Sequence, residues 1–175
     1  MPALQPPDPV KFFVSVLWRE EGALREAVGR MYDRWGDVDY EGPDHPFDLT
    51  DYYEKEMGPG LQKRFRSFLR LAPPESLVEW KQAATEIEQA LRGPAGRRVN
   101  IDPGYMDIHK VVLASLKYGP PKVHLGQGVY ADLVCRYSRG KFHPFEWTFQ
   151  DYRERRYEKE LLEMRARYKA QLAAR

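Results

Sequence analysis

Cysteine is almost absent from this chain of 175 residues, which contains one, Cys135. A single cysteine excludes an intramolecular disulfide and any metal site built from several thiolates. Cys135 stands among apolar residues in a strand-like stretch. This setting favours a buried packing residue over a nucleophile.

Long hydrophobic runs are also absent. The longest apolar stretch, FFVSVLW, is far too short to span a bilayer. The opening MPALQPPDPVK has neither the basic nor the apolar region of a signal peptide. We therefore expect a soluble, cytoplasmic protein.

The chain has little excess charge of either sign. Its 28 Lys and Arg are nearly balanced by 26 Asp and Glu, and a net charge of +2 does not by itself indicate a nucleic-acid binder. The content of 42% hydrophobic and 13% aromatic residues is too high for a disordered chain. The length suits one domain. We expect an extended lead-in over residues 1–10 and a single domain over 11–175.

Two common catalytic patterns are missing. The four histidines show no H-x-x-x-H spacing, which a helical metal site would need. No G-x-S-x-G motif is present, so the sequence gives no support for a hydrolase triad.

The periodicity of the apolar residues predicts an alternation of strands and helices. The predicted elements are a strand at 11–18, a helix at 20–35 ended by Gly36, a hairpin at 47–71, a helix beginning near Ser76, a strand from 97 that ends in an Asp-Pro-Gly turn at 102–104, a short helix at 107–119, strands within 122–149, and a charged helix at 152–175. This order predicts an α+β fold, with a mostly antiparallel sheet and helices packed on one face. The first six elements follow a ferredoxin-like order, to which an extra hairpin and the C-terminal helix are added.

The predicted hairpin, FDLTDYYEKEMGPGLQKRFRSFLRL, has the most detailed pattern. With Gly58-Pro59-Gly60 as its turn, the apolar pairs on one face are Met57–Leu61, Tyr53–Phe65 and Leu49–Leu69. The other face pairs Glu54 with Arg64 and Tyr52 with Arg66, and Glu56 lies nearby. Asp51 falls on the apolar face.

Several stretches together resemble a known family. They are FDLTDYYEKEMG, RFRSF, VNIDPGYM, VVLASLK, LGQGVYADL and EWTFQDYR, in this order over nearly the whole chain. The chain resembles the bacterial and archaeal family known as domain of unknown function 4416, which implies no established activity. Some members of that family carry the description GTP-binding protein. This chain has no G-x-x-x-x-G-K-[ST] loop and no Asn-Lys-x-Asp segment, so its residues do not support a P-loop GTPase.

Carboxylates and arginines on the hairpin suggest a site for metal and phosphate. Glu54 and Glu56 would hold Mg²⁺, which prefers oxygen ligands, and Arg64 and Arg66 would bind a phosphate beside Tyr52. The alternative is a solvated sheet face held by cross-strand ion pairs.

Two aspartates are the catalytic candidates. Asp51 would be a general acid or base, or else a cap at the start of the strand. Asp102 would be a base held by rigid backbone, or else an ordinary turn former, and Asn100 stands beside it on the same strand. Lys81 and Lys117 are candidate phosphate contacts, and Lys81 is unusual because apolar helix positions flank it.

The sequence leaves three functions open, and it does not decide whether the protein is an enzyme. The first is binding of a phosphate-bearing ligand such as a nucleotide, with Mg²⁺ as candidate cofactor. The second is a nucleic-acid-binding module that uses the arginine-rich strand, with Tyr52 and Phe68 as stacking surfaces. The third is a non-catalytic protein that docks a partner on its charged face.

Overall fold

The computed structural model describes residues 3–175, which form an α+β fold built on one nine-stranded antiparallel sheet. The strands are β1 (Val10–Trp18), β2 (Val38–Glu41), β3 (His45–Pro46), β4 (Gln62–Ala72), β5 (Val99–Met106), β6 (Lys110–Ser115), β7 (Val123–Gly126), β8 (Val129–Ser138) and β9 (Lys141–Pro144). The helices are α1 (Glu21–Trp35), α2 (Glu54–Met57), α3 (Leu77–Ala90), α4 (Gln150–Arg153) and α5 (Glu158–Ala173), with a 3-10 helix at Pro74–Ser76. The strand order is β2-β4-β1-β5-β6-β8-β7, and β3 and β9 pair with β4 and β8 respectively.

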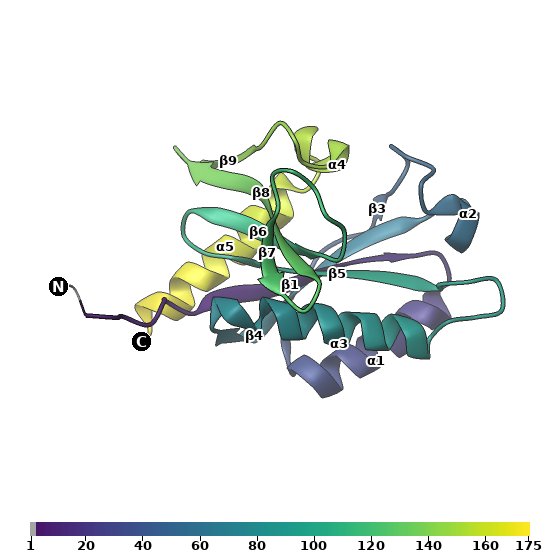
Figure 1. Ribbon diagram of the computed structural model, residues 1–175, viewed down its shortest axis with the longest axis horizontal. Helices are drawn as coiled ribbons and strands as arrows, with labels where there is room; N and C mark the ends of the chain where they lie inside the picture. The colour runs from purple at the N-terminus through teal and green to yellow at the C-terminus, as the bar shows by residue number, and fades with distance from the viewer. Residues whose placement is uncertain (1–2) are drawn as a thin grey trace.

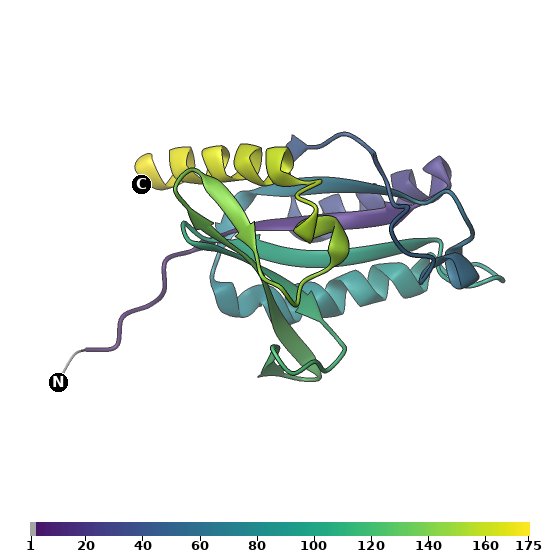
Figure 2. The ribbon, with the colours of Figure 1, turned by 90° about the horizontal axis from the view of Figure 1, so that it is seen from above.

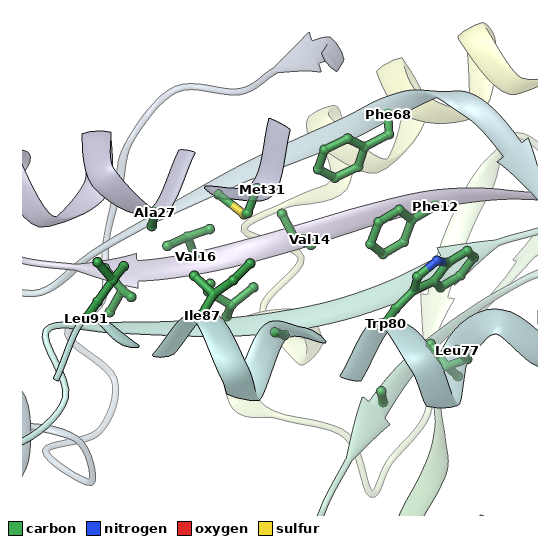
Figure 3. Packing of buried hydrophobic residues seen from close by; sticks show 14 of the residues in the cluster. Phe12, Val14, Val16, Ala27, Met31, Phe68, Leu77, Trp80, Ile87 and Leu91 are labelled. Carbon is green, nitrogen blue, oxygen red and sulfur yellow. The ribbon is translucent and has the colours of Figure 1, made fainter. Parts of the chain in front are cut away.

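Strand β1 is central and is buried on both faces, which explains its continuous apolar sequence. Helices α1 and α3 cover one face of the sheet (Figure 1). Phe12, Val14 and Val16 face these helices. Phe12 lies between two aromatic rings, with ring centroids 4.9 Å from Phe68 and 4.0 Å from Trp80 (Figure 3). Such stacked rings contribute stabilisation beyond the area they bury.

The opposite face of the sheet carries a second core. Helix α5 packs Leu161 and Met164 there against Phe13 of β1 and Phe65 of β4. In the view from above, α5 and β9 lie over the sheet, on the side away from α1 and α3 (Figure 2). The α+β class and the antiparallel sheet are therefore confirmed, and α5 places a helix on the second face as well.

The predicted 47–71 hairpin is wrong. Residues 47–53 form no strand, and Glu54–Met57 is a helical turn. Strand β4 pairs instead with β1 and β2, so Phe65 lies opposite Ser15. Apolar and polar residues do alternate along this stretch. Strand β4 nevertheless buries more apolar surface between β1 and β2 than it would beside the 47–57 segment. The apolar residues of the 47–57 segment find another place, where Phe47, Tyr53 and Met57 pack on Leu17 and Leu61.

Two further local predictions are wrong. The Asp102-Pro103-Gly104 stretch is not a turn, because β5 continues through it to Met106. Residues 107–119 are not a helix, because Lys110–Ser115 form β6. Four consecutive residues of β6, VVLA at 111–114, are buried, as in a strand covered on both faces.

The remaining elements match the predictions. Helix α1 ends at Gly36, whose φ of 81° explains the glycine. Helix α3 begins at Leu77, although the Ser76 side chain makes no capping hydrogen bond. The strands within 122–149 are confirmed as β7, β8 and β9, and the C-terminal helix is divided into α4 and α5.

The ferredoxin-like core stays a prediction. Helix α1 connects β1 to β2, and β4 lies between these two strands in the sheet. Helix α3 connects β4 to β5, and β1 lies between them. Residues 1–2 of the predicted lead-in lie outside the described residues, and 3–9 form neither helix nor strand. Within the described chain, no helix combines the length and apolar character needed to cross a bilayer.

Candidate functional site

The sheet is open between β5 and β6, and this opening creates the candidate site. The two strands pair only at Gly104, Tyr105 and Met106 of β5. Over the first part of β5, side chains of α3 take the place of the missing strand. The Ile101 N–H donates to Glu88 Oε1 at 2.6 Å, and Lys81 Nζ donates to the Ile101 carbonyl at 3.2 Å. The backbone groups of Ile101 are thereby satisfied without a neighbouring strand.

Two adjoining cavities lie at this opening. One is polar and has a volume of about 430 Å³, and the other is more apolar and has a volume of about 380 Å³. Both are in the size range of small-molecule sites. The five residues that line both cavities are Tyr53, Asp102, Leu113, Lys117 and Phe149. We call the pair of cavities the cleft.

A hydrogen-bonded network forms one wall of the polar cavity. Asn100 Nδ2 donates to Asp102 Oδ2 at 2.8 Å, and Lys81 Nζ lies 3.4 Å from Asp102 Oδ1. Arg97 donates through Nη1 to Asn100 Oδ1 at 2.6 Å, and through Nε and Nη2 to Glu56 Oε2 at 3.0 and 2.7 Å. The Asp102 carboxylate is therefore held in a fixed orientation at the junction of the two cavities.

The polar cavity carries more positive than negative side chains. It is lined by Lys81, Arg92, Arg97, Lys117 and Lys122 against Glu56, Glu88, Asp102 and Asp132. Each carboxylate has a cation within salt-bridge distance. Within residues 3–175, Lys117 and Arg92 have no such carboxylate partner. Burial raises the pKa of Glu88, while the nearby Lys81 and Arg97 charges oppose this shift.

The second cavity has aromatic and aliphatic walls. Phe47, Leu49 and Tyr52 of the 47–57 segment lie on one side, and Phe149 lies on another. Tyr52 and Phe149 are 58% and 52% exposed, so their rings are open to a ligand. Lys117 donates a hydrogen bond to the Tyr52 hydroxyl and lowers its pKa.

A buried ion pair also borders the apolar cavity. Lys63 Nζ donates to Asp151 Oδ2 at 2.8 Å, and the Tyr157 hydroxyl donates to the same oxygen at 2.9 Å. The Lys63 ammonium also lies 4.9 to 5.9 Å from the centroids of four aromatic rings. These contacts all stabilise the charged ammonium. The arrangement suits a fixed cation rather than an amine nucleophile.

Six of the residues singled out from sequence line the cleft. They are Tyr52, Glu56, Lys81, Asn100, Asp102 and Lys117. Their individual roles stay predictions. Asp51 and Glu54 are exposed and line neither cavity, whereas Asp102 lines both.

The predicted metal and phosphate residues on the hairpin are not brought together. Glu54 and Glu56 are two positions apart on a helix and diverge, and the Glu56 carboxylate is occupied by Arg97. Across residues 3–175, no group of three or more His, Cys, Asp or Glu side chains is arranged to hold a metal ion. The Glu54–Glu56 pair is thus not brought together as expected, and a role of either residue in holding Mg²⁺ stays a prediction.

Arg64 and Arg66 lie away from the cleft. Arg64 binds both carboxylate oxygens of Asp44 at 2.7 Å, and Arg66 lies 2.8 Å from Glu41. Of the two predicted stacking residues, Tyr52 is exposed, but Phe68 is 1% exposed and lies in the core that packs against α1 (Figure 3). Nucleic-acid binding and partner docking stay predictions.

Comparison with known proteins assigns the chain to a family. The sequence model described as domain of unknown function DUF4416 matches residues 8–168. The chain belongs to the DUF4416 family. No curated protein and no solved structure matches it.

The cleft of this DUF4416 protein includes residues that sequence reasoning did not single out. They include Glu88, Arg92, Lys122, Asp132, Phe149 and Asp151. Two of them carried a signal. Glu88 lies seven positions after Lys81, so both fall on the same side of α3, and Asp132 interrupts the apolar pattern of β8. Phe149 and Asp151 lie at the start of α4, a single helical turn whose position the sequence pattern does not define.

Proposed function

We propose that the cleft binds a small phosphate-bearing molecule, with the phosphate beside Lys117 and an apolar or planar part in the second cavity. The observation that carries the proposal is the pairing of two unlike cavities that share Lys117, Tyr53 and Phe149. A ligand with one anionic end and one apolar end complements both cavities at once. The predicted cytoplasmic location is part of the proposal, because such ligands are abundant there.

The cations of the polar cavity support a phosphate group in particular. Lys117 and Arg92 are the cavity's cations without a carboxylate partner among the described residues, so they are free to pair with an anion. Lys122 adds a third donor, with Nζ 3.0 Å from Ser115 Oγ. Lysine and arginine are common phosphate-binding residues in proteins.

The apolar cavity supports a planar group on the rest of the ligand. Tyr52 and Phe149 offer exposed rings from two separate segments. Stacking on such rings is worth about 1–3 kcal/mol for a nucleic-acid base. A nucleoside monophosphate has both required parts, so we use it as a probe.

The test is a thermal-shift series on the purified protein. The probes are inorganic phosphate, phenyl phosphate and adenosine 5′-monophosphate, each with and without Mg²⁺. A ligand at about one hundred times its Kd stabilises the folded state by about 2.7 kcal/mol. We expect both esters to raise Tm for the wild type, and more than inorganic phosphate does.

Variants assign the effect to the cleft. Lys117→Met and Arg92→Met each remove a cation that has no carboxylate partner. Each variant is expected to show a smaller rise in Tm when an ester is added. The matched control is Lys169→Met, because Lys169 is exposed on α5 and lines neither cavity. The proposal is wrong if no ester changes Tm, or if the shift is the same in the Lys117→Met, Arg92→Met and Lys169→Met proteins.

A further inference from the structure

Asp132 has a buried oxygen that nothing in the described chain satisfies. Its side chain lines the polar cavity and the residue is 4% exposed. One carboxylate oxygen, Oδ2, lies 3.4 Å from Lys122 Nζ. The other, Oδ1, is buried and accepts no hydrogen bond from residues 3–175. A buried polar atom without a partner is costly, so it calls for an explanation.

The register of the sheet places this carboxylate on the floor of the cavity. Asp132 of β8 lies opposite Leu113 of β6, and Leu113 lines both cavities. Ser115, two residues further along β6, points to the same side and is held by Lys122. Asp132 therefore faces the same space as the cations that we assign to the phosphate.

The chemistry of Asp132 restricts what can approach Oδ1. An ionised carboxylate only accepts hydrogen bonds, so its partner must be a donor. A phosphate dianion is not a donor and is repelled by the carboxylate. An ammonium group is disfavoured because the cavity already has a surplus of positive side chains. Among the groups that a simple phosphate ester carries, the remaining small donor is a hydroxyl group separate from the phosphate.

We infer that Asp132 accepts a hydrogen bond from a ligand hydroxyl, and that the cleft selects hydroxyl-bearing phosphate esters such as sugar phosphates and nucleotides. This inference rests on the proposed function and narrows the class of ligand. Asp132 is thus a specificity-determining residue, while Lys117 and Arg92 supply the attraction for the phosphate. The cavity volume of about 430 Å³ accommodates a five-membered sugar ring.

The test compares two phosphate esters that differ only in hydroxyl groups. Ribose 5-phosphate carries them, and tetrahydrofurfuryl phosphate has the same ring without them. Calorimetric titration of the wild type is expected to give at least about tenfold tighter binding of ribose 5-phosphate, since a buried acceptor left unpaired costs this much or more. In Asp132→Ala the ratio of the two Kd values is expected to fall to about one.

Controls separate Asp132 from a general effect on the fold. Asp107→Ala removes a carboxylate that lines neither cavity, and it is expected to keep the wild-type ratio. Asp132→Asn covers the case in which the alanine variant does not fold. It replaces a charged acceptor with a neutral one, so the ratio is expected to fall severalfold without reaching one.

The outcomes distinguish this inference from the proposed function. Equal binding of the two esters by the wild type would leave the phosphate site standing and overturn the role of Asp132. An unchanged ratio in both Asp132 variants would also overturn it. If no phosphate ester binds, the proposed function and this inference fail together.

Discussion

Gly104 lies where β1, β5 and β6 meet, and a methyl group has no room there. A Cβ atom at this position would lie 2.6 Å from the Val112 carbonyl oxygen and 2.7 Å from Leu113 Cδ2. We expect Gly104→Ala to lower the free energy of unfolding by about 1–3 kcal/mol, as overpacking does elsewhere. Urea unfolding monitored by circular dichroism measures this.

The control for Gly104 is Gly29, which is exposed on α1 and has no atom within 4 Å of its added Cβ. Gly29→Ala is expected to raise the free energy of unfolding by about 0.5–1 kcal/mol, because alanine favours the helix. Two variants with the same unfolding midpoint would show that the close contact at Gly104 carries no energetic weight.

Glu88 should make stability depend on pH. Burial raises its pKa, although Lys81, the Ile101 N–H and Arg97 oppose the shift, and Asp102 adds to it. Above the ordinary glutamate pKa of about 4.3, the unfolded chain loses this proton while the folded protein keeps it. The folded state then binds more protons than the unfolded state, so the contribution of Glu88 to stability falls as pH rises through this window.

The variant Glu88→Gln isolates this effect, since a glutamine oxygen can still accept the Ile101 hydrogen bond. We expect the stability of Glu88→Gln relative to wild type to increase between about pH 4 and about pH 8. Urea unfolding at several pH values provides the measurement. A constant difference over the range would mean that Glu88 has the same pKa in both states.

The sequence identified residues of the cleft where a polar or charged side chain stands in an otherwise apolar stretch. Lys81 stood out between apolar helix positions, and it is indeed buried against β5. Asn100 and Asp102 stood out together, and they are in direct contact. The Glu54–Arg64 pair failed because its prediction depended on a strand register rather than on either residue alone.

At the scale of elements, α2 is a single helical turn that depends on one distant arginine. Arg97 holds the Glu56 carboxylate through two side-chain nitrogens and also donates from its backbone N–H at 3.3 Å. Short helices are unstable without such contacts. We expect Arg97→Ala to increase amide hydrogen exchange over residues 53–58 and to lower the free energy of unfolding by about 1–3 kcal/mol.

Arg98 is the matched control for Arg97. Its partners, Glu20 and Glu26, are exposed carboxylates on the α1 side. Arg98→Ala is expected to change stability by less than about 1 kcal/mol and to leave exchange in α2 unaltered. Equal exchange in the two variants would show that α2 is ordered without Arg97.

The sequence predicted a helix or strand correctly where the signal for it lies within the segment itself. The spacing of apolar residues in α1, followed by Gly36, predicts that helix and its end correctly. The 47–57 segment alternates like a strand, but its apolar residues pack on Leu17 and Leu61 instead of joining the sheet. Residues 110–115 form a strand because β5 and β8 flank them, and that information is not local to the segment.

At the scale of the whole molecule, α5 spans the weakest part of the sheet. The limited pairing of β5 with β6 joins the β2-β4-β1-β5 half to the half that contains β8. The core beneath α5 includes Phe13 and Phe65 from the first half and Val111 and Val134 from the second. The helix therefore stabilises the junction as well as one face of the sheet.

Truncation tests this role. Removal of residues 158–175 would take away Leu161 and Met164, which pack in one cluster with Phe13 and Phe65. We expect the shortened protein to lose its cooperative thermal transition and to bind a hydrophobic dye. Removal of residues 174–175 alone is the control and is expected to leave the transition intact. A cooperative transition in the longer truncation would show that the sheet holds together without α5.

The fold class could be predicted from the whole sequence, whereas the cleft could not. Alternating helical and strand periods specify an α+β fold even when several elements are assigned wrongly. The cleft depends on which strands separate, and on loops that bring Tyr53, Lys117 and Phe149 together from distant parts of the chain. Those loops have no periodicity that reports their path.

At Ile101, the side chains of Glu88 and Lys81 make the hydrogen bonds that a neighbouring strand would otherwise make. This arrangement has a consequence for nuclear magnetic resonance spectra. The Ile101 amide proton points at a buried carboxylate rather than at a peptide carbonyl. A hydrogen bond to a charged acceptor is shorter and stronger than one to a neutral acceptor, so the resonance of this proton is sensitive to the ionisation of Glu88. The Ile101 amide is therefore a natural nuclear magnetic resonance probe of the electrostatic state of the cleft, and it requires no label at the ligand.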